Sequence, residues 1–170
     1  YVRFAPGNYR MLTVTLDVPV YFDVGAYLTV DAANTVTITN RITSPRQHIF
    51  RGSGSVALSS DSNSGEESRM VHVSWFGAFP AASSQGDQAP AIQKAIDAVG
   101  NTRESEILFD FGNYHIFTAM TTTRGCHIKG HGTRRTVFRL NADSFDVFTT
   151  TEVAAKFSDI QFEVESPLTA

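Results

Sequence analysis

The sequence predicts an all-β protein with one short α-helix, and three observations support this class. Threonine, serine, valine, alanine and phenylalanine are plentiful, while charged residues make up only 18% of the chain, a composition that favours half-buried, pleated strands. Short runs of alternating apolar and polar residues are separated by glycine, proline, asparagine and aspartate, the usual punctuation between strands. Only residues 88–99 have a convincing helical spacing of apolar positions.

The first half of the chain contains closely spaced strand patterns. The clearest places Val36 and Ile38 between threonines 35, 37 and 39, the period of two expected for a strand with one buried face. The expected strands here are residues 18–24, 27–30, 35–39, 48–50 and 55–58. Such strands can build a sandwich, a barrel or a β-solenoid, and periodicity alone does not choose among them.

A polar segment, SSDSNSGEESR at residues 59–69, has no apolar anchor, and we interpret it as a surface loop or linker. We therefore divide the chain into residues 1–70, a β-rich N-terminal segment, and residues 71–170.

The helix expected at residues 88–99 has recognisable ends. Asp87 is a suitable N-cap, Pro90 fits the first turn and Gly100 can stop the helix. Ile92, Ala95, Ile96 and Val99 form one apolar stripe. About three turns are too few to be stable alone in water, so the stripe must lie on an apolar surface such as the open end of a solenoid.

Six further strands are expected after the helix, at residues 106–111, 114–118, 125–129, 136–140, 145–149 and 156–163. The candidate core residues are the large apolar residues of these strands and of the turns beside them: Ile107, Phe109, Ile116, Ile128, Val137, Phe138, Val147, Phe157, Ile160 and Phe162. An internal echo supports a repeating coil, because FAPGNYR at residues 4–10 returns as FDFGNYH at residues 109–115. In both copies glycine permits a tight turn before an aromatic residue resumes the strand.

The order VSWFGAFPAASSQGDQAPAIQKAIDAVG (residues 73–100), followed by ILFDFGNYHI (residues 107–116), resembles the entry into a right-handed parallel β-helix of the pectate-lyase-like superfamily. CHIKGHGTRRTVF (residues 126–138) resembles a rung of that family. With a β-rich segment ahead of it, the chain looks most like phage tailspikes and tail fibres. The resemblance implies the first coils of a parallel β-helix in residues 71–170, covered by the short helix, with each strand paired to its counterpart in the neighbouring coils.

For function, the resemblance implies a virion component that acts in host adsorption. In the family, homotrimers bind and often depolymerise host-surface polysaccharide, and they attach to other phage tail or capsid proteins. We expect this chain to be the structural, particle-proximal fragment of such a protein, with polysaccharide bound by the part that follows. Two alternatives stay open: a non-catalytic receptor-binding fibre, and a secreted, extracellular bacterial polysaccharide lyase or glycoside hydrolase.

The charge and the apolar runs of the chain bear on whether nucleic acid or a membrane is a partner. A net charge of −3 gives no electrostatic argument for nucleic acid or an anionic membrane, and the apolar runs are too short to span one. Cys126 is the only cysteine, and we expect it to be a buried small hydrophobe.

No residue of the sequence is assigned a catalytic, cofactor-binding or metal-binding role. The carboxylates Asp143, Asp146, Glu152, Asp159, Glu163 and Glu165 gather near the end of the chain, but nothing pairs them as glycan hydrolysis requires. His127 and His131 have metal-like spacing only on a helix, whereas their glycine neighbours predict a strand and turn. The sequence shows no serine–histidine–carboxylate constellation with a supporting motif.

Two groups of side chains are possible contact surfaces. The densest basic cluster, Arg124, Lys129, Arg134, Arg135 and Arg139, could meet an acidic polysaccharide or protein. Thirteen phenylalanines exceed what a narrow coil can bury, so we expect some to face outward where a trimer partner could cover them: Phe79, Phe111, Phe117, Phe145 and Phe148. Trp75 and Phe76 are instead expected to pack beneath the helix.

Overall fold

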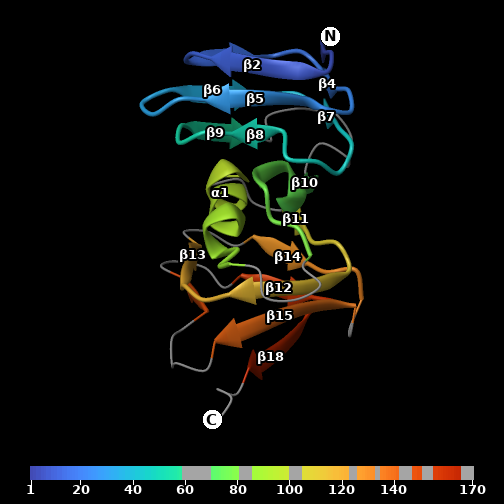
Figure 1. Ribbon diagram of the computed structural model, residues 1–170, viewed down its shortest axis with the longest axis vertical. Coiled ribbons are helices and arrows are strands. Elements are labelled where there is room, and N and C mark those ends of the chain that lie inside the picture. Colours follow the sequence, from blue (N-terminus) through green and yellow to red (C-terminus); the bar gives the residue numbers. More distant parts are fainter. Residues whose placement is uncertain are drawn as a thin grey trace.

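The chain forms a parallel β-solenoid with a single α-helix, which confirms the predicted fold class. The computed structural model describes residues 1–58, 70–80, 86–99, 105–122, 126–132, 135–141, 147–150 and 155–165. Every strand pairing among these residues is parallel. The coils stack along one axis, with β2 near one end and β18 near the other (Figure 1).

Three regular coils form what we call the upper stack. Its strands are β1 (Val2–Phe4), β2 (Gly7–Met11), β3 (Val14–Leu16), β4 (Val20–Phe22), β5 (Ala26–Val30), β6 (Thr35–Ile38), β7 (Ile42–Thr43), β8 (Phe50–Arg51) and β9 (Ser55–Leu58). They form three sheets in the orders β1-β4-β7, β2-β5-β8 and β3-β6-β9. Each coil therefore contributes one strand to each of three faces.

The remaining elements form the lower stack. Its first coil holds β10 (Met70–His72), the 3₁₀ helix η2 (Val73–Phe76) and α1 (Ala89–Val99). The later strands are β11 (Glu106–Leu108), β12 (Gly112–Ile116), β13 (Met120–Thr122), β14 (His127–Lys129), β15 (Thr136–Asn141), β16 (Phe148–Thr150), β17 (Lys156–Ser158) and β18 (Gln161–Glu165). Their sheets are β10-β11-β14-β17, β12-β15-β18 and β13-β16.

The expected strands correspond to most of those observed, but the list lacks β1, β2, β3, β7, β10 and β13, and it merges two others. The single strand expected over residues 156–163 is β17 and β18, separated by Asp159 at φ 59°. A left-handed residue turns the chain at this corner, consistent with the turn-like character of Asp159 in the sequence. The expected linker at residues 59–69 and the stop at Gly100 lie outside the described residues, and the division into residues 1–70 and 71–170 stays a prediction.

One hydrophobic core runs through both stacks. A column of phenylalanine rings joins them: Phe4 to Phe22, Phe22 to Phe50 and Phe50 to Phe76 have centroid separations of 5.1, 6.0 and 5.2 Å. Parallel in-register strands place equivalent side chains above one another, so one inward aromatic position repeats from coil to coil. Since Phe76 belongs to η2, the column continues into the first coil of the lower stack.

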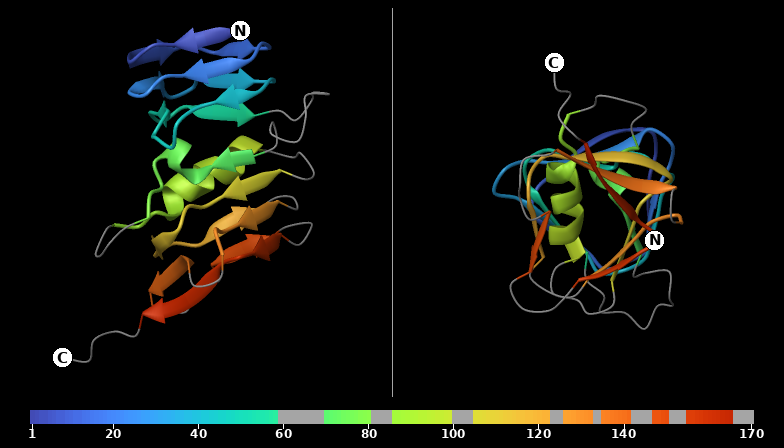
Figure 2. Two further views of the ribbon diagram at one scale, coloured as in Figure 1. Left: turned by 90° about the vertical axis from the view of Figure 1, so that its right-hand side faces the viewer. Right: turned by 90° about the horizontal axis from the view of Figure 1, so that it is seen from below.

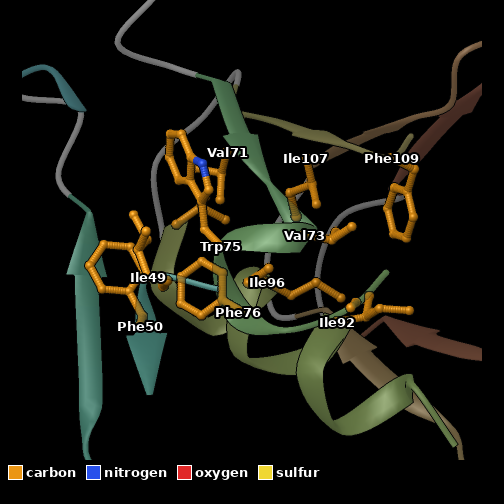
Figure 3. Packing of buried hydrophobic residues seen from close by; sticks show 14 of the residues in the cluster. Ile49, Phe50, Val71, Val73, Trp75, Phe76, Ile92, Ile96, Ile107 and Phe109 are labelled. Carbon is orange, nitrogen blue, oxygen red and sulfur yellow. The ribbon is translucent and has the colours of Figure 1, made fainter. Parts of the chain in front are cut away.

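The helix α1 lies inside the solenoid, between the two stacks, rather than at an open end as the sequence suggested. It packs against β9 of the upper stack and against η2, β10 and β13 of the lower stack. Seen along the axis, it falls within the outline of the coils (Figure 2). Ile92 is fully buried and Ile96 is 6% exposed, and both lie in the packed interior beneath η2 (Figure 3). The helix therefore covers the lower stack, as predicted, and also closes the upper one.

Side-chain amides replace missing backbone partners around the helix. The Gln93 amide donates to the Thr121 carbonyl at 2.9 Å and accepts from the Thr121 N–H at 2.8 Å. Gln88 donates its backbone N–H to the His115 carbonyl at 2.9 Å, and its side-chain oxygen accepts from the His115 N–H at 3.1 Å. A carboxamide has the donor and acceptor pattern of a peptide group, so these residues satisfy strand edges that a helix leaves unpaired.

The predicted N-cap joins the helix to the following coil. The Asp87 carboxylate accepts from the Ala89 N–H at 3.0 Å and from the Phe117 N–H at 2.9 Å, and it also accepts from the Thr118 hydroxyl. Asp87 therefore caps the first turn, as predicted, and fixes the end of β12 against that turn.

The repeated sequence FxxGNY forms the same corner twice. Gly7 and Gly112 have φ values of 150° and 128°, and the following tyrosine packs edge-on against the preceding phenylalanine with a centroid separation of 5.0 Å in both copies. The sequence echo therefore corresponds to a structural repeat.

Most of the predicted core is confirmed, with two exceptions in the last coil. Ile107, Phe109, Ile116, Ile128, Val137 and Phe138 are buried, and Val147 and Ile160 are partly buried against the core. Phe157 and Phe162 are 37% and 45% exposed, so their prediction as core residues is wrong. They lie on β17 and β18, and no strand of the described chain packs beyond these two.

Candidate functional site: a serine–histidine–glutamate relay on one flank

Three polar side chains from successive coils are hydrogen-bonded in a row on the β10-β11-β14-β17 face. His127 Nδ1 lies 3.0 Å from Glu106 Oε1, and His127 Nε2 lies 2.7 Å from Ser158 Oγ. We call Glu106, His127 and Ser158 the flank triad. The carboxylate, imidazole and hydroxyl follow the order in which a general base links an orienting group to a nucleophile.

The strand register explains why these residues meet. Glu106 on β11 pairs directly with His127 on β14, and Lys129 pairs with Ser158 on β17. Ile107 and Ile128, the central residues of β11 and β14, are fully buried. Because successive side chains of a strand alternate between its faces, the residues beside these isoleucines point outward. The solenoid thus places three outward residues from distant parts of the sequence on one open face.

The flank triad is partly shielded from solvent yet accessible. The side chains of His127 and Glu106 are 17% and 28% exposed, and Ser158 is half-buried. A neutral imidazole protonated at Nδ1 satisfies both contacts, because it donates to the Glu106 carboxylate and accepts from the Ser158 hydroxyl. In this tautomer Nε2 can take the serine proton, so the geometry suits activation of the hydroxyl.

Two lysines lie beside the flank triad. Lys129 Nζ is 3.4 Å from Glu106 Oε2, so the carboxylate contacts both the imidazole and an ammonium group. Lys156 is exposed and pairs in register with His127, and it shares the outward face of β17 with Ser158, two residues away. Lys129 and Lys156 therefore lie on the same strand face as the flank triad.

Sequence analysis did not predict this arrangement. Glu106, His127 and Ser158 are separated by 21 and 31 residues, and no local motif surrounds the serine. The strands EIL, HIK and KFS each place at least one polar residue beside a central apolar residue, and this pattern could have indicated the flank triad. Recognising it requires knowing which strands stack and in which register.

Other candidates from the sequence do not come together as a site. His127 lies in β14 whereas His131 follows the strand, as the strand-and-turn interpretation predicted. Glu163 contacts Arg139 at 3.5 Å and accepts from the Gln161 amide at 2.8 Å. Asp143, Asp146 and Glu152, with the side chain of Glu165, lie outside the described part of the chain. Among the described residues, no group of three histidine, cysteine or acidic side chains is placed to hold a metal ion.

The remaining predicted residues have mainly structural surroundings. Trp75 and Phe76 are each 4% exposed, which confirms their prediction as core residues. They belong to η2, which packs against α1, and Phe76 also contacts Phe50 of the upper stack (Figure 3). Cys126 is buried, and burial raises the pKa of its thiol. Within the basic cluster, Lys129 and Arg139 are paired with Glu106 and Glu163, while Arg124 and Arg134 lie outside the described residues.

Two grooves open where the upper and lower stacks meet. One, of 190 Å³, is lined by Arg41, Ile42, Thr43, Ser44, Met70, His72 and Trp75. The other, of 390 Å³, lies between the turn after β8 and the exposed side of α1, where Lys94 Nζ donates to the Gly52 carbonyl at 2.8 Å. Neither groove contains the paired carboxylates that glycosidic hydrolysis uses. The flank triad is thus the stronger candidate for chemistry.

Comparison of the chain with protein-family models, with curated protein sequences and with solved structures gives no match. Among the described residues, no helix is both long and apolar enough to cross a membrane.

Proposed function

We propose that this chain is the structural, particle-proximal part of a phage tailspike or tail fibre, and that the whole protein is a homotrimer that binds host-surface polysaccharide. The β-solenoid fold is compatible with such proteins and with pectate-lyase-like enzymes. The observation that carries the proposal is the coil containing η2 and α1. Its Trp75-Phe76-Gly77-Ala78 tetrad and short helix begin a new run of parallel coils, in the order that the sequence resemblance implies.

The packing supports a structural role for this coil. The Phe50–Phe76 contact and the hydrogen bond from the Ile49 N–H to the Trp75 carbonyl, 3.1 Å long, join it to the upper stack. Arg46 pairs with Asp110 across the same junction. Apolar packing and hydrogen bonds thus connect both stacks in one core, as a spike that transmits force from host to particle would require.

Exposed aromatic residues support the proposed trimer. Phe111 is 66% exposed, and Phe79 and Phe117 are each 37% exposed. Pro80 lies against Gly112. Their chain neighbours Phe79 and Phe111 are therefore exposed near the same corner of two successive coils. A patch of this kind suits burial by a second copy of the chain. Phe148 is half-buried, and Phe145 lies outside the described residues.

The mass of the intact native protein tests the assembly. We expect three times the chain mass at micromolar concentration, and a monomer would contradict the spike proposal and favour the secreted lyase or hydrolase. Phe111→Ser should weaken the trimer, whereas Leu12→Ser, which changes a comparably exposed apolar residue on the first coil, serves as the matched control.

Polysaccharide assays test whether the intact protein binds polysaccharide while residues 1–170 have only a structural role. We expect the intact protein to bind one member of a capsule and O-antigen panel, and we expect residues 1–170 alone to release no reducing ends or unsaturated products. Glycosidic cleavage by residues 1–170 that disappears in Glu163→Gln would contradict the structural assignment, because that residue is here paired with Arg139.

A further inference from the structure

We propose that the flank triad hydrolyses acyl esters, with Ser158 as nucleophile, His127 as general base and acid, and Glu106 as the residue that positions the imidazole. The grounds are the two contacts of His127, one to a hydroxyl at 2.7 Å and one to a carboxylate at 3.0 Å. Both lie within the range in which a base and its orienting group act on a nucleophile.

The first half-reaction transfers the acyl group to the protein. Ser158 Oγ forms a bond to the ester carbonyl carbon while its proton passes to His127 Nε2. The resulting imidazolium is stabilised by the Glu106 carboxylate on its other nitrogen. The bond from the carbonyl carbon to the alcohol oxygen then breaks, and the leaving alcohol takes the proton from Nε2. The products of this step are a free alcohol and an acyl-serine.

Water completes the cycle. A water molecule gives one proton to His127 Nε2 and bonds through oxygen to the acyl carbon, after which the bond to Ser158 Oγ breaks. The serine oxygen recovers the proton from Nε2, and a carboxylic acid leaves. No oxidant, metal or cofactor is needed, because the only other reactant is water.

The position of the flank triad indicates what kind of ester it takes. The triad lies on an open strand face of three successive coils rather than in either junction groove, so it offers little enclosure for a small molecule. A long carrier could lie along the flank and present an acyl group to Ser158, with Lys129 and Lys156 favouring a carrier that is anionic. If the proposed function holds, that carrier is an O-acylated surface polysaccharide.

Covalent labelling tests the nucleophile without any assumption about the carrier. A fluorophosphonate probe should label residues 1–170 at Ser158, as located by peptide mass spectrometry, and Ser158→Ala should remove the label. Ser53→Ala, at an exposed turn, is the matched control and should label as the unchanged chain does. An unlabelled Ser158 in the folded chain, or equal labelling after Ser158→Ala, would overturn the proposal.

Hydrolysis of p-nitrophenyl acetate tests the base and its orienting partner. We expect His127→Ala to lower kcat/KM by about 100-fold or more, the usual contribution of a general base. His131→Ala, at an exposed histidine, controls for free imidazole catalysis and should leave the rate unchanged. Glu106→Gln should lower kcat by about tenfold with little change in KM, and Glu106→Asp should recover part of that loss. Equal rates for His127→Ala and His131→Ala would overturn the assignment.

The folded state of each variant is checked independently by circular dichroism and thermal melting, and only folded variants are compared. Acetate release from O-acetylated and chemically deacetylated polysaccharide then tests the carrier. If the protein is labelled and hydrolyses p-nitrophenyl acetate but releases no acetate from polysaccharide, the esterase assignment stands and the polysaccharide carrier is excluded. Loss of all three activities in the folded chain would exclude the esterase and leave the proposed spike untouched.

Discussion

The upper and lower stacks share one architecture but differ in how far the chain travels between equivalent strands. In the upper stack Val2 pairs with Val20, and Val20 with Ile42, so each coil takes about 20 residues. In the lower stack Met70 pairs with Glu106, which pairs with His127, which pairs with Lys156. Coil length varies far more there, from 21 residues between Glu106 and His127 to 36 residues between Met70 and Glu106, and the longest coil is the one that contains the helix. The strands thus keep their parallel pairing, while the number of residues between paired strands varies from coil to coil.

The junction between the stacks shows what happens where a strand is replaced. On one face α1 takes the place of a strand, and the edge of β13 is completed by the Gln93 side chain. On the neighbouring face the core continues through the Phe50–Phe76 contact. The two stacks are therefore joined by apolar packing, a few side-chain contacts and the hydrogen bond from the Ile49 N–H to the Trp75 carbonyl, whereas within each stack the coils are joined by continuous backbone ladders. Changes at the junction should separate these two sources of stability.

The largest effect is expected from Ile96→Asp in the helix. An uncompensated carboxylate among buried apolar residues should lower the free energy of unfolding by more than about 4 kcal/mol, measured by urea denaturation. Lys94→Asp is the control, since its exposed side chain loses only the hydrogen bond to the Gly52 carbonyl and should cost about 1 kcal/mol. Equal midpoints for the two variants would show that the helix is not part of a shared core.

Gly52→Ala tests a corner of the upper stack. Gly52 has a φ of 93°, and a Cβ there would lie 2.2 Å from the Val30 carbonyl oxygen. A left-handed backbone and a backbone clash together should cost about 2–4 kcal/mol, measured as a lower melting temperature. Gly86→Ala, which meets nothing within 4 Å, should change stability by less than about 0.5 kcal/mol. A neutral Gly52→Ala would mean that the coil relaxes freely at this corner.

Gln93→Ala tests whether a side-chain amide replaces a strand. The Thr121 N–H and carbonyl would both lose a partner, so we expect a loss of about 1–2 kcal/mol and faster hydrogen exchange at the Thr121 amide. Asp97→Ala is the control on the same helix, because it loses only the exposed contact with Gln93. If the Thr121 amide exchanges equally in both variants, the amide does not act as a ladder partner.

The smallest effect expected is a dependence of stability on pH near the junction. Burial lowers the pKa of His72, assisted by Arg46 and opposed by Asp110. Burial also lowers the pKa of His48, assisted by Arg51 and Lys94 and opposed by the hydrogen bond to the Phe50 carbonyl. As pH falls below the ordinary histidine pKa of about 6.5, the unfolded chain binds protons before the folded chain does. Stability should therefore decrease as pH falls below about 6.5, towards the lowered folded pKa values.

Melting temperatures between pH 5.5 and 7.5 measure this dependence. His48→Gln and His72→Gln together should flatten the profile, and His131→Gln, at an exposed position, should leave it as it was. A profile that keeps its slope in the double variant would place the titrating groups elsewhere in the molecule.

Much of the fold could be predicted from local patterns. The alternation around Val36 and Ile38 located β6 because a half-buried strand requires a period of two. The stripe of Ile92, Ala95 and Ile96 located α1 within one residue of its observed start, because helix faces repeat at 3.6 residues. The echo of FxxGNY marked the same corner twice. The all-β class and the parallel coils follow from these features together with the resemblance.

The sequence by itself determined the helix, most of the strands and most of the inward side chains, because each depends on residues within one turn or one strand. The tertiary structure alone decided that α1 lies between two stacks, that Phe157 and Phe162 are exposed, and that Glu106, His127 and Ser158 meet. These facts depend on which strand pairs with which and in what register, and the corners that set the register vary in length. A one-residue slip in any pairing would turn an outward side chain inward, so only the folded coils bring these three side chains together.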